Sequence, residues 1–227
     1  MGSVGLTLRW EHRISSVAAG GAGRVESAEI GAQAKRPNGM TPEDAALAAG
    51  CQAGDMLAYE RLYRAQGLRM RNLARNLLGS QTDAEDAVQE TFLKIQRGAS
   101  GFRGQSSFVT WAFRILVNTC RDMRRSRLRR RERLSDGADP EKPQPREPRA
   151  PGAHPSLRMA LEHALAELTD HQRQVFLLYE VEGFRHSEIA AMLEISETAS
   201  KNTLFQAKRN LRSMLEPPRS AEAGGGR

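Results

Sequence analysis

The chain has 227 residues, of which 39% are hydrophobic, 27% charged and only 5% aromatic. It carries 34 lysines and arginines against 27 acidic residues, which gives a formal net charge of +7. No stretch approaches the roughly 18 uninterrupted apolar residues of a membrane-spanning helix, so we expect a soluble protein without membrane insertion. Cys51 and Cys120 cannot form a disulfide framework, and none of the five histidines has metal-ligand spacing. We therefore expect two buried thiols, and neither a metal nor a cofactor.

The positive charge is concentrated in one short segment. Between residues 121 and 133, eight arginines stand against Asp122 and Glu132, so this window holds +6 of the net +7. Such a concentration indicates a polyanionic partner, either nucleic acid or a membrane surface. Because no large apolar face lies opposite these arginines, the sequence favours nucleic acid.

Residues 1–40 are rich in glycine, alanine and serine and show no hydrophobic periodicity. They lack the apolar core of a signal peptide, and we predict that they are disordered. Met40 is followed at once by a helix start, because Thr41 can cap a helix whose first residue is Pro42 and whose third is Asp44. Residues 1–39 are therefore either a disordered extension or a segment upstream of the translation start.

The pattern from residue 41 to 133 is helical and predicts a first domain of four helices. The second helix runs from residue 55 to the stop signal Gly79. The third begins at a capping box formed by Thr82 and Glu85 and ends near residue 97. The fourth opens at Ser106 or Ser107 and continues into the arginine segment.

A proline-rich linker separates this domain from a second one. Six of the ten prolines fall between residues 134 and 155, a density that no helix or strand tolerates. These residues could span about 68 Å at roughly 3.1 Å each. In the second domain, residues 156–216, Ser156 is predicted to cap one helix, and Thr169 and Gln172 form a capping box for the next, which ends at Gly183. Residues 217–227 are predicted to be a disordered tail. The expected fold class is all-α, with two small helical domains on a flexible linker.

The run from His186 to Leu211 has the spacing of a helix-turn-helix. Ala190 is the small residue that lets two helices approach closely, and Glu194 stands where a left-handed turn residue is needed. Ser196 can cap the second helix, which then offers side chains suited to base edges and phosphates in a major groove. The alternative is an amphipathic helical hairpin with a solvated basic face.

The third predicted helix of the first domain has two distinct faces. Val88, Phe92 and Ile95 lie on an apolar face, whereas Asp86 and Glu90 belong to an acidic one. An acidic face is commonly just solvated. Its position beside a basic, DNA-seeking helix favours a contact with a basic protein partner.

Three collinear blocks resemble the extracytoplasmic-function (ECF) sigma factors of bacterial RNA polymerase. They are DAEDAVQETFLKI, FRGQSSFVTWAFRILVNTCRD and LTDHQRQVFLLYEVEGFRHSEIAAMLEIS. The likeness covers about residues 41–215. It implies a first domain (41–133) that binds core polymerase and the −10 element, and a second, helix-turn-helix domain (156–216) that binds the −35 element. The resemblance also implies that the middle domain of larger sigma factors is absent.

The resemblance also assigns roles by position. The acidic helix would dock on the clamp helices of the polymerase β′ subunit through Asp83, Asp86, Gln89 and Glu90. The following loop and helix would open the promoter and read the −10 element as single-stranded DNA, whose unpaired bases offer stacking faces and hydrogen-bonding edges. The −10 residues are Phe102, Arg103, Arg114, Asn118 and Asp122, with Arg121, Arg124 and Arg125 also placed to neutralise phosphates. Trp111 matches such a position too, but its place on the apolar stripe favours a core role.

The second domain would read the −35 element as duplex DNA and touch the polymerase β flap. The residues at the corresponding positions are Ser196, Lys201, Asn202, Phe205, Gln206 and Arg209. Thr198, Ser200 and Gln206 depart from the common family pattern, which puts the particular −35 sequence in doubt. In many relatives an anti-sigma factor wedges between the two domains, and the long linker permits this arrangement here.

The predicted function is therefore that of an ECF sigma factor, which directs promoter-specific transcription initiation in the cytoplasm. The alternative is a conventional helix-turn-helix regulator that acts without core polymerase. We expect no enzymatic activity, because the sequence offers no nucleophile–base pair, glycine-rich phosphate loop or metal constellation.

Overall fold

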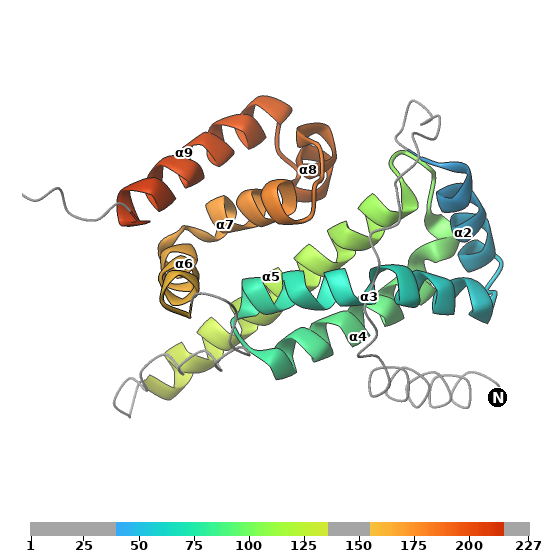
Figure 1. The fold of residues 1–227 in the computed structure, drawn as a ribbon. Coiled ribbons are helices and arrows are strands. Elements are labelled where there is room, and N and C mark those ends of the chain that lie inside the picture. The colour runs from blue at the N-terminus through green and yellow to red at the C-terminus, as the bar shows by residue number, and fades with distance from the viewer. Residues whose placement is uncertain (1–39, 136–154, 216–227) are drawn as a thin grey trace, which may run out of the picture. The chain divides into compact units, whose positions relative to one another are not determined.

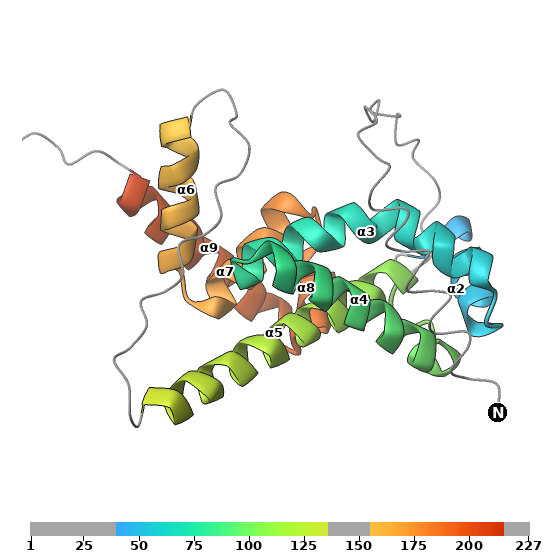
Figure 2. The same ribbon diagram turned by 90° about the horizontal axis from the view of Figure 1, so that it is seen from below.

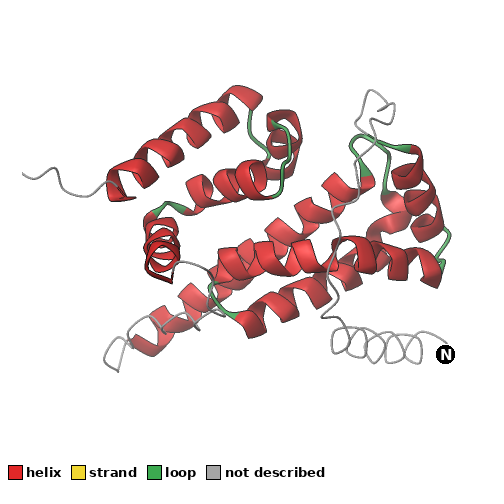
Figure 3. Cartoon of the chain, viewed as in Figure 1, coloured by secondary structure: helices red, strands yellow, loops and turns green. Residues whose placement is uncertain are grey.

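The computed structural model describes residues 40–135 and 155–215, and every regular element in these two ranges is helical (Figures 1 and 3). This confirms the all-α fold class. The predicted disordered segment 1–40 lies outside the described residues except for Met40, which is buried, so the prediction is wrong for that residue. The predicted tail 217–227 and nearly all of the predicted linker also lie outside the described residues. We refer to residues 40–135 as the N-terminal unit and to residues 155–215 as the C-terminal unit.

The two units contain the following helices. In the N-terminal unit these are α2 (Pro42–Gln52), α3 (Met56–Leu78), α4 (Gln81–Gly98), a 3-10 turn (Ala99–Gly101) and α5 (Phe108–Ser135). In the C-terminal unit they are α6 (Pro155–Glu167), α7 (Asp170–Phe176), a π-helical segment (Leu177–Val181), α8 (His186–Leu193) and α9 (Glu197–Leu215).

Several predicted helix termini are confirmed. The Thr41 hydroxyl accepts a hydrogen bond from the Asp44 amide at 3.2 Å, and Gly79 ends α3 in the left-handed conformation at φ 77°. The capping box of Thr169 and Gln172 is formed at the start of α7. Gly183, at φ 74°, follows the end of this helical run, whose π-helical last part the sequence pattern did not predict.

Two predicted caps are wrong. The hydroxyl of Ser80 accepts a hydrogen bond from the Asp83 amide at 3.3 Å, so α4 begins at Gln81 and Thr82 lies inside its first turn. The next correction concerns α6, which begins at Pro155, a residue whose fixed φ suits the first helical position. Ser156 is consequently inside the helix and not before it.

The core of the N-terminal unit lies between α3, α4 and α5. Leu62, Phe92, Ile95, Phe108 and Phe113 are fully buried there. Cys51 and Cys120 are buried free thiols, as predicted, and burial raises the pKa of each to about 12. The last turns of α5 project beyond α3 and α4 (Figures 1 and 2), and Arg125, Arg127, Arg129 and Arg130 are exposed.

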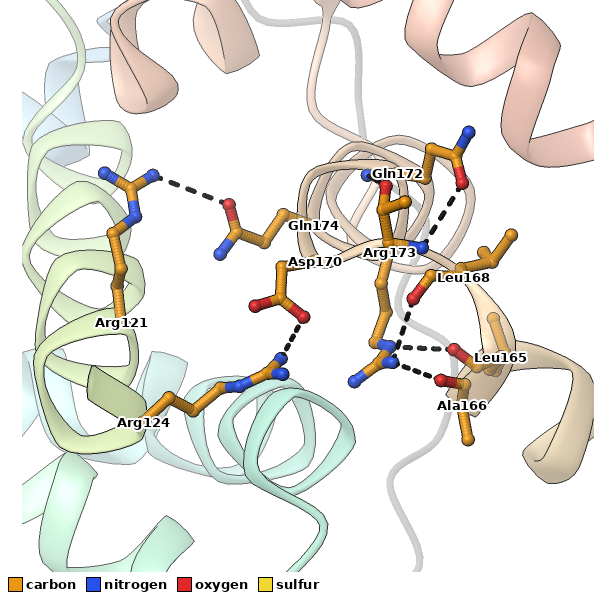
Figure 4. Close-up of polar contacts among 10 residues, drawn as sticks. Arg121, Arg124, Leu165, Ala166, Leu168, Asp170, Gln172, Arg173 and Gln174 are labelled. Atoms are coloured by element: carbon orange, nitrogen blue, oxygen red, sulfur yellow. Dashed lines mark hydrogen bonds and ion pairs between the residues drawn. The ribbon is translucent and has the colours of Figure 1, made fainter. Parts of the chain in front are cut away.

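In the C-terminal unit, α6 packs against α9 through Ala164, Leu168, Ala207 and Leu211. The buried guanidinium of Arg173 donates hydrogen bonds to the carbonyls of residues 165, 166 and 168, at 2.7, 2.7 and 3.1 Å (Figure 4). These carbonyls at the end of α6 have no partner within the helix. One side chain of α7 therefore terminates α6 and ties the two helices together.

The carboxylate of Asp44 links α2 to the start of α5. Its two oxygens accept hydrogen bonds from the amides of Phe108 and Val109, at 2.6 and 3.0 Å, and Ser107 adds a bond from the Thr110 amide at 2.9 Å. Asp44 is itself buried. Of the two predicted caps for α5, Ser107 is thus correct and Ser106 is not, and a residue more than sixty positions away completes the cap.

We expect Asp44→Ala to lower the free energy of unfolding by about 2 kcal/mol, because it leaves two amides at a helix N-terminus without acceptors. Urea unfolding followed by circular dichroism measures this loss. The matched control is Asp55→Ala, which removes an exposed cap that accepts one hydrogen bond, from the Leu57 amide. A loss for Asp44→Ala no larger than that for Asp55→Ala would contradict the assignment.

Candidate nucleic-acid interface

The acidic face predicted on the third helix is present on α4. Val88, Phe92 and Ile95 are buried, while Asp86 and Gln89 are exposed on the other side. Glu90 is half-buried, with its carboxylate 3.9 Å from the Lys94 ammonium.

Asp83 differs from the other members of this set. Its carboxylate forms an ion pair with Arg127 of α5. One predicted polymerase contact is therefore held by a member of the arginine segment, and Asp86, Gln89 and Glu90 form the accessible part of the acidic face.

The loop between α4 and α5 carries an aromatic cluster. Phe102, Phe108 and Trp111 are neighbours, with ring centroids 5.1 to 5.4 Å apart. Phe102 and Trp111 are both half-buried, so the cluster is neither a closed core nor a set of free rings. Trp111 is thus more accessible than its place on the apolar stripe predicted.

The position of this loop is fixed from α2. The Gln52 side-chain amide donates a hydrogen bond to the Phe102 carbonyl at 2.9 Å, and Asp44 holds the residues that follow the loop. Gly104 has a φ of 67°, which L residues other than glycine seldom adopt. The exposed Arg103 is consequently presented by a loop whose two ends are anchored.

Four polar residues of α5 share one face of the helix, because they are spaced three or four residues apart. We call this set the −10 face: Arg114, Asn118, Arg121 and Arg125. Asp122 and Arg124 flank it on either side. The opposite side of α5 is the buried one, so packing of the core sets the direction in which this face points.

A cavity of about 200 Å³ lies where the loop meets α5. Phe102, Arg103, Trp111 and Arg114 line it from the N-terminal unit, and Ala191 and Met192 line it from α8. Three of the predicted −10 residues, Phe102, Arg103 and Arg114, thus line one concave site, whereas those further along α5 do not line it.

Polar groups of the C-terminal unit contact the arginines of α5. Arg114 forms an ion pair with Glu194, and Arg124 forms one with Asp170 at 2.5 Å. Arg121 lies 3.5 Å from the side-chain oxygen of Gln174 (Figure 4). Sequence reasoning identified these arginines but none of their partners, because no local pattern relates positions 46 to 80 residues apart.

The helix-turn-helix is formed by α8 and α9. Glu194 occupies the turn in the left-handed conformation, at φ 58°, as predicted. Ile189 and Leu193 are buried between the helices, and Ser196 caps α9 by accepting a hydrogen bond from the Ala199 amide at 3.0 Å. The predicted Ser196 cap is therefore confirmed, and the hydroxyl that the resemblance assigns to DNA contact is also the cap of α9.

The predicted −35 residues on α9 form one exposed surface. It consists of Lys201, Asn202, Phe205, Gln206 and Arg209, and Phe205 is 65% exposed. Lys201 forms an ion pair with Glu197 at 2.7 Å, and the hydrogen bond from Lys201 lowers the pKa of that carboxyl group. This surface offers a cation, amides and an apolar ring to a groove.

Ser200 is fully buried on α9, where an aliphatic residue was expected from the resemblance. Its hydroxyl lies 2.9 Å from Nδ1 of His186, and the His186 ring stacks on Tyr179 with centroids 4.4 Å apart. A polar pair thus connects the first turn of α8 to α9. His186 was not singled out in the sequence because its partner lies fourteen residues away, across the turn.

Family models for sigma-70 region 2 and sigma-70 region 4 match residues 62–131 and 158–211, which together make up more than half of the chain. With the fold and the two surfaces, they define a sigma-70-type protein that contains these two regions.

Sequence identity to individual relatives defines the class of protein more closely. The chain is 32% identical to the ECF RNA polymerase sigma factor SigM of Mycobacterium tuberculosis over 174 residues, which cover 76% of this chain and 84% of SigM. It is 30% identical to the RNA polymerase sigma factor CnrH of Cupriavidus metallidurans, covering 78% of this chain and 97% of CnrH.

Solved structures agree with these relatives. The structure of CnrH in complex with the cytosolic domain of CnrY matches with a TM-score of 0.58 and 26% identity, covering 76% of this chain and 96% of that one. The sigma factor RpoE of Bartonella quintana, solved with the anti-sigma factor NepR, shares the fold at a TM-score of 0.57 and 22% identity, covering 71% of this chain and 98% of that one.

The chain belongs to the ECF RNA polymerase sigma factors, which direct promoter-specific transcription initiation. Within residues 40–135 and 155–215, no helix is long and apolar enough to cross a membrane.

We expect Ser200 and His186 to be energetically coupled. Ser200→Ala leaves Nδ1 of a half-buried imidazole without its partner, and His186→Ala does the same to a buried hydroxyl, so each should lower the free energy of unfolding by about 1–2 kcal/mol. The double variant should lose less than the sum, with a coupling of about 1 kcal/mol. Chemical unfolding of the three variants and the parent chain measures the cycle, and strict additivity would show that the contact contributes nothing.

Proposed function

We propose that this sigma factor divides promoter recognition among three surfaces. The acidic face of α4 binds the clamp helices of the polymerase β′ subunit, the −10 face and its cavity hold single-stranded DNA, and the exposed surface of α9 reads the −35 duplex. The C-terminal unit also contacts the β flap. The observation that carries the proposal is the placement of the −10 face beside an aromatic-lined cavity, on the helix that holds the arginine segment.

The chemistry of the −10 site suits an unpaired base. The cavity is bounded by the rings of Phe102 and Trp111, and base–aromatic stacking is worth about 1–3 kcal/mol per base. Asn118 provides an amide that can donate to and accept from a base edge. Arg103, Arg114, Arg121, Arg124 and Arg125 neutralise the backbone, with Asp122 at the margin of the face.

The α9 surface suits a major groove. Lys201, Asn202, Gln206 and Arg209 offer the hydrogen-bonding groups that read base edges, and the ring of Phe205 can contact a thymine methyl group. Ser196 fixes the N-terminus of α9, which also favours a phosphate nearby.

The proposal also covers the domain boundaries, the location and the regulation of the protein. The boundaries 41–133 and 156–216 delimit the two domains, the protein acts in the cytoplasm, and it performs no chemistry of its own. An anti-sigma factor regulates it, as a relative in complex with the anti-sigma factor NepR suggests. A regulator that acts without polymerase is not favoured, because the chain carries region 2 as well as the helix-turn-helix.

Run-off transcription tests the function as a whole. Purified protein with core polymerase and genomic DNA should start transcription at defined promoters, and sequencing of the 5′ ends should reveal both promoter elements. Transcription that does not depend on the added protein would refute the proposal.

The acidic face can be tested separately. The double variant Asp86→Lys/Glu90→Lys should reduce core-polymerase binding at least a hundredfold, because like charges would face a basic partner. Binding is measured by fluorescence anisotropy of labelled protein titrated with core enzyme. The control variant Glu43→Lys/Glu60→Lys makes the same charge change on α2 and α3, and an equal loss in that variant would assign the effect to net charge.

The −10 face can be tested through its salt dependence. Replacing Arg114, Arg121 and Arg125 by alanine removes three phosphate contacts, so the slope of log K against log[salt] should flatten by about 2 for single-stranded DNA. The measurement uses the holoenzyme and a −10 non-template strand from a mapped promoter. Alanine at the exposed Arg61, Arg64 and Arg97 of α3 and α4 should leave the slope unchanged. Equal flattening by both triple variants would contradict the assignment.

A further inference from the structure

The surface that we assign to the −10 element is occupied by the protein itself. Three of its arginines contact acceptors of the C-terminal unit. Arg114 contacts Glu194. Figure 4 shows the other two contacts, of Arg121 with Gln174 and of Arg124 with Asp170. Two of the three acceptors are carboxylates. A carboxylate and a phosphate make the same kind of charge-assisted hydrogen bond to a guanidinium, so these acceptors stand where a nucleic-acid backbone would bind.

These contacts surround a buried anchor. The ring of Phe184, which is 7% exposed, meets the edge of Phe113 of α5 at 5.0 Å between centroids. The guanidinium of Arg69 of α3 lies over both rings, at 5.2 and 5.8 Å. The same group binds Glu182, with Nε 3.1 Å from the carboxylate and Nη2 donating to the backbone carbonyl at 2.8 Å.

Two residues of the C-terminal unit also line the cavity beside the −10 face. These are Ala191 and Met192 of α8. Thr110, which lines the cavity as well, donates a hydrogen bond from its hydroxyl to the Glu188 carboxylate at 3.2 Å. Residues of α8 therefore occupy part of the surface that a base would contact.

We propose that the C-terminal unit of this chain binds to the −10 surface of the N-terminal unit and competes there with single-stranded DNA. In this closed arrangement Asp170 and Glu194 hold the arginines, Phe184 anchors the contact, and α8 lines part of the cavity. The inference rests on the proposed role of α5 and of the loop before it. The surface of α9 remains exposed, so closure blocks −10 recognition and not the contact with the −35 duplex.

The contact between the two units is suited to reversible dissociation. The side chain of Glu182 is only 4% exposed, and burial raises its pKa even though Arg69 acts in the opposite direction. Desolvation therefore offsets much of the attraction within this pair. The ion pairs of Arg114 and Arg124 are partly exposed and individually weak. Because both units belong to one chain, their high effective concentration compensates for a weak contact, and a ligand that binds either face can displace it.

The first test measures the affinity of the free, full-length protein for a labelled −10 non-template strand by fluorescence anisotropy. Asp170→Asn/Glu194→Gln should bind it at least fivefold more tightly than the parent chain, because the arginines are released. Glu167→Gln/Glu180→Gln removes the same charge from the C-terminal unit without touching α5 and should change the affinity less than twofold. Equal affinities for the parent chain and both variants would overturn the inference, as would an equal gain in the two variants.

The second test measures closure directly. Spin labels at Ser100→Cys and Ser213→Cys, both exposed, report the distance between the units. Cys51 and Cys120 should stay unlabelled, because burial suppresses the thiolate that reacts. The parent chain should show one narrow distance. Arg69→Ala should broaden it, because this change removes the guanidinium that contacts Phe184 and Glu182 without altering any proposed DNA or polymerase contact. An unchanged distribution in Arg69→Ala, or a broad one in the parent chain, would overturn the inference.

Transcription by the holoenzyme separates this inference from the proposed function. Asp170→Asn/Glu194→Gln and the parent chain should start at the same promoter positions once core polymerase is bound. If they do, but the affinity and distance measurements show no closure, the inference is wrong and the proposed function stands. If no defined start is obtained with either protein, the proposed function itself fails.

Discussion

The structure depends on the two faces of α5. Phe108, Phe113 and the apolar residues that follow them at helical spacing pack against α3 and α4, and this packing leaves no rotational freedom for the opposite face. Arg114, Asn118, Arg121 and Arg125 point away from the core for that reason alone. A shift of one position in the apolar pattern would rotate the helix by about 100° and carry the arginines out of line with the loop.

The start of α5 is fixed as firmly as its rotation. Asp44 and Gln52 of α2 hold the two ends of the loop that carries Phe102 and Arg103. The family match for region 2 begins at residue 62, after these two positions. A helix outside the matched region therefore sets the geometry of the loop that we assign to −10 recognition, and it does so through one buried carboxylate and one amide.

Much of this architecture could be predicted from local patterns. Thr41 with Pro42, Gly79, and Thr169 with Gln172 each marked a helix end correctly, because a cap is formed within four residues. Ser80 was missed because Thr82 with Glu85 matches the capping-box pattern, whereas in the structure the Ser80 hydroxyl accepts from the Asp83 amide and Thr82 lies inside the helix. The contacts that relate distant positions, such as Asp44 with Phe108 or Arg124 with Asp170, have no local pattern at all. The sequence could show that these side chains needed partners, but not which ones.

The asymmetry between a covered α5 and an exposed α9 has a consequence for how the protein behaves among other polyanions. RNA and unpaired DNA compete for any open basic groove through their backbones, without regard to sequence. In the closed arrangement that we propose, carboxylates of the same chain occupy that groove, so free molecules would not be sequestered by such strands. The surface of α9, to which we assign −35 recognition, stays exposed in that arrangement, and most duplex sites that it meets would be released quickly because their sequence is wrong. The proposed closure thus covers the less selective surface and leaves open the one that discriminates.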